Sequence, residues 1–346
     1  MTRIANVVGA RPQFIKAGPI SKALADHGVD ELLIHTGQHY DPLLSGDIMR
    51  DIGLREPDVN LGVGSASHGV QTAAMLEGVE SILQTQQVDA LLTYGDTNST
   101  IAGALAATKL GVFTGHVEAG LRSFNRRMPE ELNRVVTDHL SDVLFAPTAN
   151  AMEHLRREGL GERAVLTGDV MVDALQSVDF TQVRIPDWAL EDFYVATIHR
   201  AENTDDSGRL KEILDSLDRV DSPVHLLAHP RLKSRLDDLN MSPGSLRIHD
   251  PLPYAEMLGT LRASGGLYTD SGGLQKEALI LGVRCVTIRG ETEWPETLQG
   301  SWNVLAEPGD DLAGMMRRDV VHQEHSPFGD GRAASAIVRH LIERLG

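Results

Sequence analysis

The chain alternates short runs rich in β-branched residues with amphipathic stretches of helical length. Such alternation predicts βαβ units and a parallel sheet, because parallel strands can be joined only through long crossovers. We therefore expect a doubly wound α/β fold. The strands expected in the first half are Thr2–Val8, Glu31–Thr36, Ala90–Tyr94, Val112–Val117, Asp142–Ala146 and Ala164–Thr167.

The same pattern restarts after a polar, proline-containing stretch at 176–187, which predicts a second domain of the same class. We expect one domain over 1–175 and another over 176–330, with the cleft between them as the ligand site. The strands expected in the second domain are Phe193–Ile198, Val224–Ala228, Leu246–Ile248, Gly266–Thr269, Cys285–Ile288 and Asn303–Leu305.

Charge and cysteine content exclude several classes of protein. Acidic residues number 49 against 32 basic ones, a formal charge of −17 that disfavours binding to nucleic acid or anionic lipid. Cys285 is the only cysteine, so no intramolecular disulfide and no cysteine-based zinc site can form. We find neither an apolar run of membrane-spanning length nor a signal-peptide pattern, and we expect a cytoplasmic protein. The GxGxxG, P-loop and G-x-S-x-G motifs are missing, which argues against nicotinamide, P-loop and serine-hydrolase chemistry.

One strand-to-helix junction in the second half carries a phosphate-binding signal. Ser271, Gly272 and Gly273 follow a predicted strand, and a helix is expected from about Leu274. Glycines let a ligand approach the backbone, and free N–H groups at a helix N-terminus favour an anion. Glu277, one turn further on, is placed to accept hydrogen bonds from ribose hydroxyls. An ordinary βα turn would have the same composition, so the motif alone leaves both interpretations open.

The first half offers two cations directly after its first strand. Arg11 and Lys16 flank the start of a helix, where positive charge opposes the helix dipole. Two cations at the carboxyl end of a strand could instead neutralise a leaving diphosphate. Two solvated surface charges are the alternative.

Three carboxylates follow strand ends or open a helix in the same domain: Asp96, Glu118 and Glu130. Each alone could be a helix cap, but several in one crevice push their pKa values apart and supply an acid and a base at one pH. Arg134 lies four residues after Glu130 and is expected on the same helix face. His199, at the end of a strand in the second domain, is a further candidate, although a lone histidine there can be structural.

These segments together resemble the non-hydrolysing UDP-N-acetylglucosamine 2-epimerases. The resemblance implies a GT-B architecture of two facing Rossmann-like domains, with a C-terminal helix within 331–346 crossing back onto the first. It also implies a homodimer, a UDP-sugar substrate and no metal or nicotinamide cofactor. The matching motifs are GARPQFIK, HTGQHYD, YGDTNST, HVEAGLRS, MPEELNR, TGDVMVDAL, TIHRAEN and TDSGGLQKEA.

The resemblance also implies a mechanism, in which UDP is eliminated from C1 as the C2 proton is removed, and then re-adds to a 2-acetamidoglucal. Asp96, Glu118 and Glu130 would carry the proton transfers. His199 would lie near the diphosphate, with substrate contacts from Arg11, Lys16, Arg134, Ser271, Gly272, Gly273 and Glu277.

Some positions depart from the bacterial pattern of this family. Trp294 stands where many bacterial members have an arginine at the diphosphate, and Met257 stands where they have an aromatic residue against uracil. Gln38 and His39 match a pair that serves allosteric activation by UDP-N-acetylglucosamine, but His68 replaces a glutamine of that site. We therefore expect weak or absent allostery.

Four alternatives stay open. The nearest is an epimerase of UDP-2,3-diacetamido-2,3-dideoxy-glucuronic acid, whose carboxylate would want an extra cation such as Arg126 or Arg127. The hydrolysing UDP-N-acetylglucosamine 2-epimerases share the same carboxylates. A UDP-sugar glycosyltransferase or a pure binding protein would not need three carboxylates in one domain.

The acidic, lysine-poor composition predicts a protein adapted to concentrated salt. Only six of the 32 basic residues are lysine, and salt near 1 M reduces the Debye length to about 3 Å, which screens the repulsion among surface carboxylates. We expect the denaturation midpoint and activity to rise with KCl concentration. A protein that stays folded and active after dialysis into dilute buffer would contradict this prediction.

Overall fold

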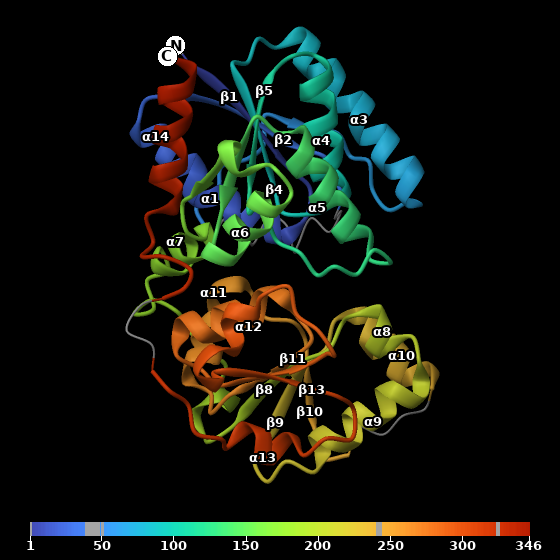
Figure 1. Cartoon of the computed structure of the whole chain (residues 1–346). Coiled ribbons are helices and arrows are strands. Elements are labelled where there is room, and N and C mark those ends of the chain that lie inside the picture. Colours follow the sequence, from blue (N-terminus) through green and yellow to red (C-terminus); the bar gives the residue numbers. More distant parts are fainter. Residues whose placement is uncertain (1, 39–48, 50–51, 240–243, 323–325) are drawn as a thin grey trace. The chain divides into compact units, whose positions relative to one another are not determined.

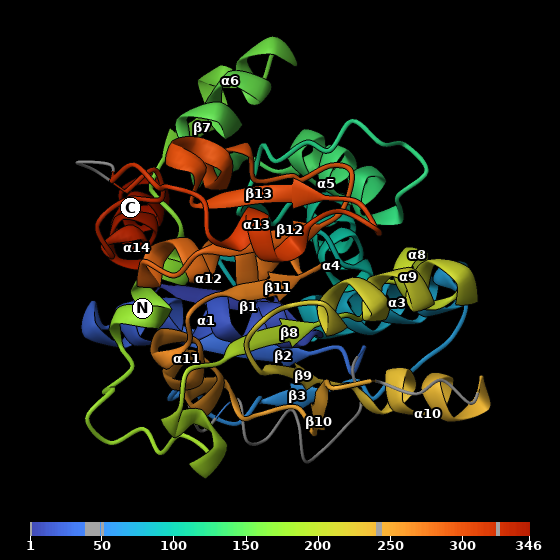
Figure 2. The same cartoon turned by 90° about the horizontal axis from the view of Figure 1, so that it is seen from below.

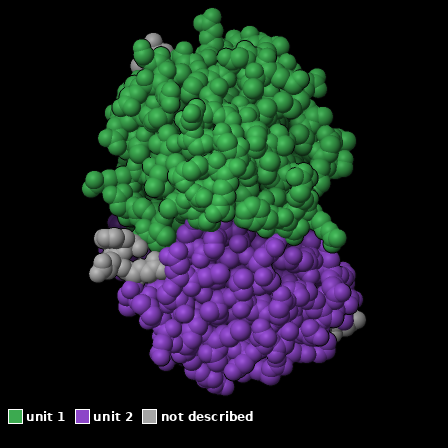
Figure 3. Space-filling view, in the orientation of Figure 1, with its two compact units in different colours: residues 1–178, 325–346 green, residues 179–324 purple. Residues whose placement is uncertain are grey.

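The computed structural model describes residues 2–38, 49, 52–239, 244–322 and 326–346. The chain divides into two units, Met1–Val178 with His325–Gly346, and Asp179–Glu324 (Figure 3). The sequence predicts domain boundaries at 175/176 and 330/331. The observed boundaries, at 178/179 and 324/325, each lie a few residues from the predicted ones. The short segment before the last helix belongs to unit 1.

Within its described residues, unit 1 has a parallel sheet in the order β3-β2-β1-β4-β5-β6-β7 (Figure 1). The central strand β4 is buried along its whole length, as expected for a parallel strand covered on both faces. The strand order reverses between β1 and β4, which is where α/β sheets of this class bind ligands. The strands are β1 (Arg3–Val8), β2 (Asp30–His35), β3 (Val59–Asn60), β4 (Ala90–Tyr94), β5 (Phe113–Val117), β6 (Val143–Ala146) and β7 (Ala164–Leu166).

Helices cover both faces of this sheet. Helices α1, α7 and α14 pack together on one face, and α3, α4 and α5 pack together on the other (Figure 1). The helices of unit 1 are α1 (Arg11–Asp26), α3 (His68–Thr85), α4 (Asn98–Lys109), α5 (Pro129–Leu140), α6 (Ala149–Arg157), α7 (Val170–Gln176) and α14 (Ala333–Leu345), with a 3₁₀ turn at Gly161–Arg163.

The C-terminal helix α14 is fixed to unit 1 by its apolar face and by a cap. Ile337, Val338 and Leu341 are buried in the core. At the other end, the Asp173 carboxylate of α7 accepts hydrogen bonds from the backbone N–H groups of Ala333 and Ala334, at 3.2 and 2.9 Å. A carboxylate at a helix N-terminus satisfies free N–H groups and complements the helix dipole.

Unit 2 repeats the architecture, with a parallel sheet in the order β10-β9-β8-β11-β12-β13 among its described residues (Figure 2). The strands are β8 (Tyr194–Thr197), β9 (Val224–Leu227), β10 (Arg247–His249), β11 (Leu267–Thr269), β12 (Cys285–Ile288) and β13 (Asn303–Ala306). The helices are α8 (Ala201–Thr204), α9 (Ser207–Asp218), α10 (Pro230–Asp238), α11 (Tyr254–Ala263), α12 (Gly272–Leu281) and α13 (Leu312–Met316), with 3₁₀ segments at Asp187–Leu190 and Pro295–Ser301.

The observed strands confirm the predicted fold class. Each of the twelve predicted strands coincides with an observed one, and β3 was missed because a two-residue strand has no readable period. Cys285 is buried in β12. Among the described residues, no helix is long and apolar enough to cross a membrane.

One edge of the second sheet carries a stack of three aromatic rings. The Trp188 ring lies 4.1 Å from that of His225 and 4.5 Å from that of His249, centroid to centroid. His225 Nδ1 and His249 Nε2 are 2.8 Å apart. Burial, with the charges of His249 and Arg247, lowers the pKa of His225 to about 4. Burial also lowers the pKa of His249.

Acid should therefore weaken unit 2. Because the folded-state pKa of His225 lies below the unfolded value of about 6.5, the unfolded chain binds the extra proton more readily, and stability is lost as pH falls from about 6.5 to about 4. We expect a His225→Gln variant to lose less stability than wild type over this interval in urea denaturation, with tryptophan emission as the probe, since all three tryptophans lie in unit 2. The exposed His139→Gln change is the control. Equal slopes in His225→Gln and wild type would contradict the assignment.

Candidate active site

A buried ion pair joins the first helix of unit 1 to the end of β5. Lys16 Nζ lies 2.6 Å from Glu118 Oε1, and both side chains are less than a tenth exposed. Lys16 is buried because the stretch of α1 from Gln13 to Gly18 is buried on all sides of the helix. A buried charge is tolerated when it is paired, and the pair fixes the Glu118 carboxylate at the carboxyl edge of the sheet.

The backbone at Glu118 adopts a conformation that side-chain-bearing residues rarely occupy. Its φ is +72°, and the N–H groups of Glu118 and Ala119 both point to the carbonyl of Phe145, at 3.2 and 3.1 Å. Strain of this kind persists only when the surroundings enforce it, and it is concentrated at functional sites. The turn at Gly95, directly after β4, lies next to this ion pair. A Cβ placed on Gly95 would lie 3.4 Å from Lys16 Nζ and 3.6 Å from Glu118 Oε1.

Asp96 follows this second turn and is held by Arg134 of α5. Arg134 donates from Nε and Nη2 to Asp96 Oδ2, at 2.9 and 2.6 Å. Asp96 Oδ1 has no hydrogen-bond partner within the described part of the chain, and the side chain is 26% exposed. Asp96 thus combines an oriented carboxylate with one oxygen open to accept a proton.

Arg134 is itself oriented by Glu131, whose Oε2 accepts from Arg134 Nη1 at 2.9 Å. Burial raises the pKa of Glu131, but hydrogen bonds from Ser123 and Phe124 and the charge of Arg134 outweigh that effect and lower it overall. The resulting chain of Glu131, Arg134 and Asp96 holds one candidate base through two successive charge-assisted contacts.

The third predicted carboxylate, Glu130, lies elsewhere on the same helix. The spacing predicts that Glu130 and Arg134 share a face of α5, and the ion pair that Arg134 makes within this helix is with Glu131. Arg134 turns toward the sheet to reach Asp96, and the buried carboxylate one turn earlier on that side is Glu131. Glu130 is exposed, without an ion pair to any described residue.

The remaining candidates of unit 1 lie near the same edge of the sheet. Arg11 is the first residue of α1 and is half-buried. Gln38 Oε1 accepts from the N–H and hydroxyl of Ser99, at 3.2 and 2.8 Å, which ties the predicted allosteric glutamine to α4. His68 opens α3 and contacts Asn98. His39 lies outside the described residues.

In unit 2, His199 is held by a buried aspartate that the sequence did not single out. His199 Nδ1 lies 2.8 Å from Asp270 Oδ1, and the imidazole is half exposed. The Asp270 carboxylate also accepts from the backbone N–H of Arg200 and from Asn203. Burial raises the pKa of Asp270, but these hydrogen bonds and His199 outweigh it and lower the pKa. Donation from Nδ1 to Asp270 leaves Nε2 of His199 for chemistry at the exposed side.

The predicted phosphate turn is the N-terminus of α12, which begins at Gly272 rather than Leu274. Ser271 caps the helix by accepting from Leu274 N–H. A side chain at Gly272 would collide with Glu293 Oε1, whereas one at Gly273 would meet only open space near Ser271 Oγ. The turn therefore presents bare backbone N–H groups, an arrangement suited to an anion.

Glu277 is buried one turn into α12, and its Oε1 accepts from the hydroxyl of Tyr254 at 3.0 Å. Trp294 and Met257, the two residues that depart from the bacterial pattern, are also buried. The Lys276 ammonium lies 3.6 Å from the centre of the Trp294 ring, a cation–π contact in the interior. Met257 packs into the core with Phe193 and Leu261.

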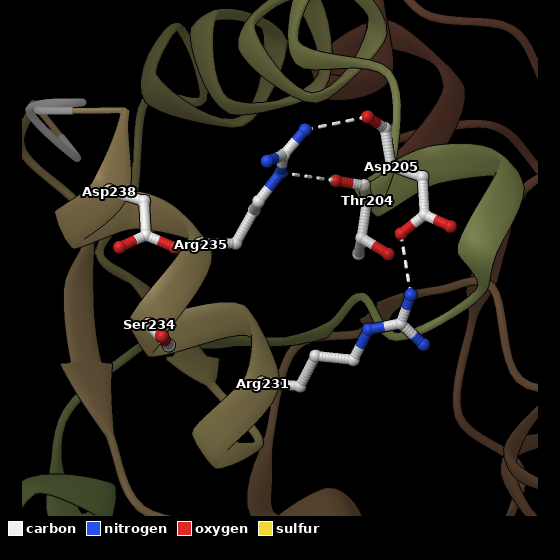
Figure 4. Close-up of a pocket in the computed structure, with 6 residues that line it drawn as sticks. All are labelled: Thr204, Asp205, Arg231, Ser234, Arg235 and Asp238. Atoms are coloured by element: carbon white, nitrogen blue, oxygen red, sulfur yellow. Dashed lines mark hydrogen bonds and ion pairs between the residues drawn. The ribbon is translucent and has the colours of Figure 1, made fainter.

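Two cavities open in unit 2, and the smaller one reaches His199. The larger, about 200 Å³, lies between α8 and α10, and its arginines are engaged: Arg231 pairs with Asp205, and Arg235 donates to backbone carbonyls of Thr204 and Asp205 (Figure 4). The smaller, about 30 Å³, shares Thr204 and Arg231 with it and is lined by His199. In the part of the chain that the structure describes, no group of three or more His, Cys, Asp or Glu side chains could hold a metal ion.

Sequence reasoning missed four residues that hold the candidates in place: Glu131, Asp270, His116 and Asp138. His116 Nδ1 lies 2.7 Å from Asp138 Oδ1, in the core behind Asp96 and Glu118. Glu131, His116 and Asp270 lie inside motifs that were recognised, but each motif contained a more conspicuous carboxylate. Asp138 gave no signal, since an aspartate in the last turn of a helix has no sequence signature of burial.

The Lys16–Glu118 pair can be tested through stability. Lys16→Met leaves a buried carboxylate without its cation, which typically costs about 3–5 kcal/mol. We expect that loss in the free energy of unfolding by urea, and Lys16→Met with Glu118→Gln should recover much of it. Lys22→Met, which removes an exposed lysine of the same helix, should stay within about 0.5 kcal/mol of wild type. Equal effects of the Lys16 and Lys22 changes would refute a buried pair.

Comparison with known proteins places these features in one family. Residues 22–342 match the family model described as UDP-N-acetylglucosamine 2-epimerase. The chain is 41% identical to the UDP-2,3-diacetamido-2,3-dideoxy-D-glucuronate 2-epimerase of Pseudomonas aeruginosa, over 99% of both chains. It is 38% identical to the UDP-N-acetylglucosamine 2-epimerase of Methanocaldococcus jannaschii, over 98% of both.

The crystal structure of the M. jannaschii UDP-GlcNAc 2-epimerase in complex with UDP-GlcNAc and UDP superposes with a TM-score of 0.91 at 37% identity, covering 99% of this chain and all of that one. This likeness, together with the two parallel sheets, confirms the GT-B fold class predicted from the sequence. The chain belongs to the UDP-N-acetylglucosamine 2-epimerase family and is an isomerase.

Proposed function

We propose that the protein interconverts UDP-N-acetylglucosamine and UDP-N-acetylmannosamine without releasing UDP to solution. A carboxylate removes the C2 proton, the electrons of that C–H bond form the C1=C2 double bond, and the C1–O bond breaks with its electron pair leaving on UDP. Return of a proton to the opposite face of C2 and re-addition of UDP at C1 complete the inversion. No net oxidation occurs, so the reaction needs no redox partner.

The observation that carries this proposal is the pair of carboxylates at the carboxyl edge of the first sheet, each held by its own cation. Glu118 is paired with Lys16 and Asp96 with Arg134. Removing a proton from one face and returning one to the other requires two separate groups, and general acid–base catalysis contributes about 10²- to 10⁴-fold for each. Glu130, exposed on α5, is proposed as the third member.

The leaving diphosphate requires positive charge and hydrogen-bond donors. We assign this role to Arg11 and Lys16 in unit 1, and to Ser271, Gly272, Gly273 and His199 in unit 2. Stabilisation of the charge that develops on the leaving group is a large term in such reactions, because the C2 proton is weakly acidic. Asp270 supports it by fixing the tautomer of His199. Glu277 is assigned to the ribose.

A second candidate substrate is UDP-2,3-diacetamido-2,3-dideoxy-glucuronic acid, supported by the 41% identity to an epimerase of that name. Arg126 and Arg127 are exposed in the segment between Glu118 and α5 and could pair with the sugar carboxylate. The homodimeric state implied by the resemblance and the cytoplasmic location expected from the sequence belong to the same proposal.

The decisive experiment is proton NMR of each UDP-sugar with the protein in D₂O, at high KCl and with EDTA. We expect the 2-epimer with deuterium at C2 and UDP still attached. Release of free N-acetylmannosamine and UDP would indicate the hydrolysing reaction. Turnover of the diacetamido-uronate alone would assign the second substrate. No turnover of either sugar by folded protein would refute the proposal and favour a transferase.

Variants test the proposed acid and base. Asp96→Asn and Glu118→Gln should each lower kcat by about 10²-fold or more while leaving UDP affinity within a few-fold, because they remove proton transfer but not the nucleotide contacts. Glu77→Gln, an exposed carboxylate of α3, is the control. Loss of UDP affinity with unchanged kcat would indicate a binding role instead.

A further inference from the structure

Behind the two candidate carboxylates lies a buried histidine whose two ring nitrogens both face acceptors. His116 of β5 is fully buried. Its Nδ1 lies 2.7 Å from Asp138 Oδ1, and its Nε2 lies 2.7 Å from the backbone carbonyl oxygen of Gly95. A backbone carbonyl can only accept, and so can an ionised carboxylate. Both ring nitrogens must then carry protons, which makes His116 an imidazolium.

The charges around His116 balance this buried cation. Asp138 Oδ2 lies 2.8 Å from Arg122 Nη2, and Arg122 pairs in turn with Glu158 at 2.7 Å. Two cations and two anions therefore form one neutral cluster, which reduces the cost of burying each charge. Burial raises the pKa of Asp138, but the contacts with His116 and Arg122 outweigh it and lower the pKa, so Asp138 is the ionised partner.

The same pair holds the two turns that carry the candidate carboxylates. His116 donates to the carbonyl of Gly95, the residue before Asp96. Asp138 Oδ2 accepts from the N–H of Gly120, two residues after Glu118, at 3.1 Å. Gly95, Glu118 and Gly120 all have positive φ, at +63°, +72° and +81°. Glycine adopts this region freely, whereas Glu118 carries a side chain and holds this conformation only because its surroundings enforce it.

We propose that His116 and Asp138 are positioning residues, forming a charged clamp that fixes Asp96 and Glu118 relative to one another. His116 holds the Asp96 turn through Nε2–H, and Asp138 holds the Glu118 turn through the Gly120 N–H. Neither touches the substrate. The clamp rests on the proposed function for its catalytic consequence, but its charge state is a property of the unliganded protein.

A glutamine at position 116 cannot replace the imidazolium. Its amide nitrogen can donate toward Asp138 or toward Gly95, but the amide oxygen then faces the other acceptor. Asp138→Asn differs, because an asparagine amide can donate to a neutral His116 while its oxygen still accepts from Gly120. The two variants therefore separate loss of the clamp from loss of its charge.

The charge is tested by NMR of protein selectively labelled with ¹⁵N-histidine, without substrate. We expect both ring nitrogens of His116 to carry protons at neutral pH, with the assignment confirmed by the absence of both signals in His116→Gln. In Asp138→Asn the Nδ1 proton should be lost. A His116 ring in wild type with one unprotonated nitrogen at neutral pH would overturn the proposal.

The positioning role is tested by kinetics on whichever UDP-sugar the wild type converts. His116→Gln should lower kcat by about 10²-fold with KM within about threefold, as misplacement of a catalytic group by about 1 Å does, while the exposed His139→Gln on α5 should match wild type. Unchanged kcat in folded His116→Gln would overturn the role. If wild type converts neither sugar, the proposed function fails, and the ring protonation alone decides whether the clamp exists.

Discussion

The functional edge of unit 1 depends on the parallel register of β1, β4 and β5. Tyr94 of β4 pairs with Val117 of β5, and Asn6 of β1 pairs with Leu92 of β4. The strands therefore end together, and the residues that follow them, including Asp96 and Glu118, gather at one edge. Because the strand order reverses between β1 and β4, the helices that follow diverge to opposite faces and leave that edge open.

Charge compensation then decides which side chains can occupy this edge. Glu118, Glu131 and Asp138 are buried carboxylates in a strongly acidic chain, and each lies against a cation: Lys16, Arg134, and Arg122 with His116. Unit 2 repeats this principle with Asp270 and His199. A partnered carboxylate stays ionised and keeps one orientation, and both properties are needed in a group that must take up a proton from a defined direction.

Much of the fold was readable from the sequence, but only part of the site was. The strands before Asp96 and Glu118 have continuous apolar runs, and the residues after parallel strands must lie at one edge, so this grouping followed from topology. Topology does not decide whether Glu130 or Glu131 is the partner of Arg134. Adjacent residues on a helix point about 100° apart, and which one faces inward depends on how α5 packs against α4 and on the distance from Arg134 to Asp96.

The sequence by itself determined that both sheets are parallel, where their strands lie along the chain and which residues follow each strand. Hydrophobic periodicity and turn composition are local properties, so they can be read without the tertiary structure. Only the tertiary structure decided how these residues are held. The contact of Lys16 with Glu118 joins residues 102 positions apart, and that of His199 with Asp270 joins residues 71 apart. The clamp of His116 and Asp138 likewise arises from the packing of α5 against β5. Such contacts depend on the angle and depth at which a helix meets a sheet, and no local sequence pattern specifies either.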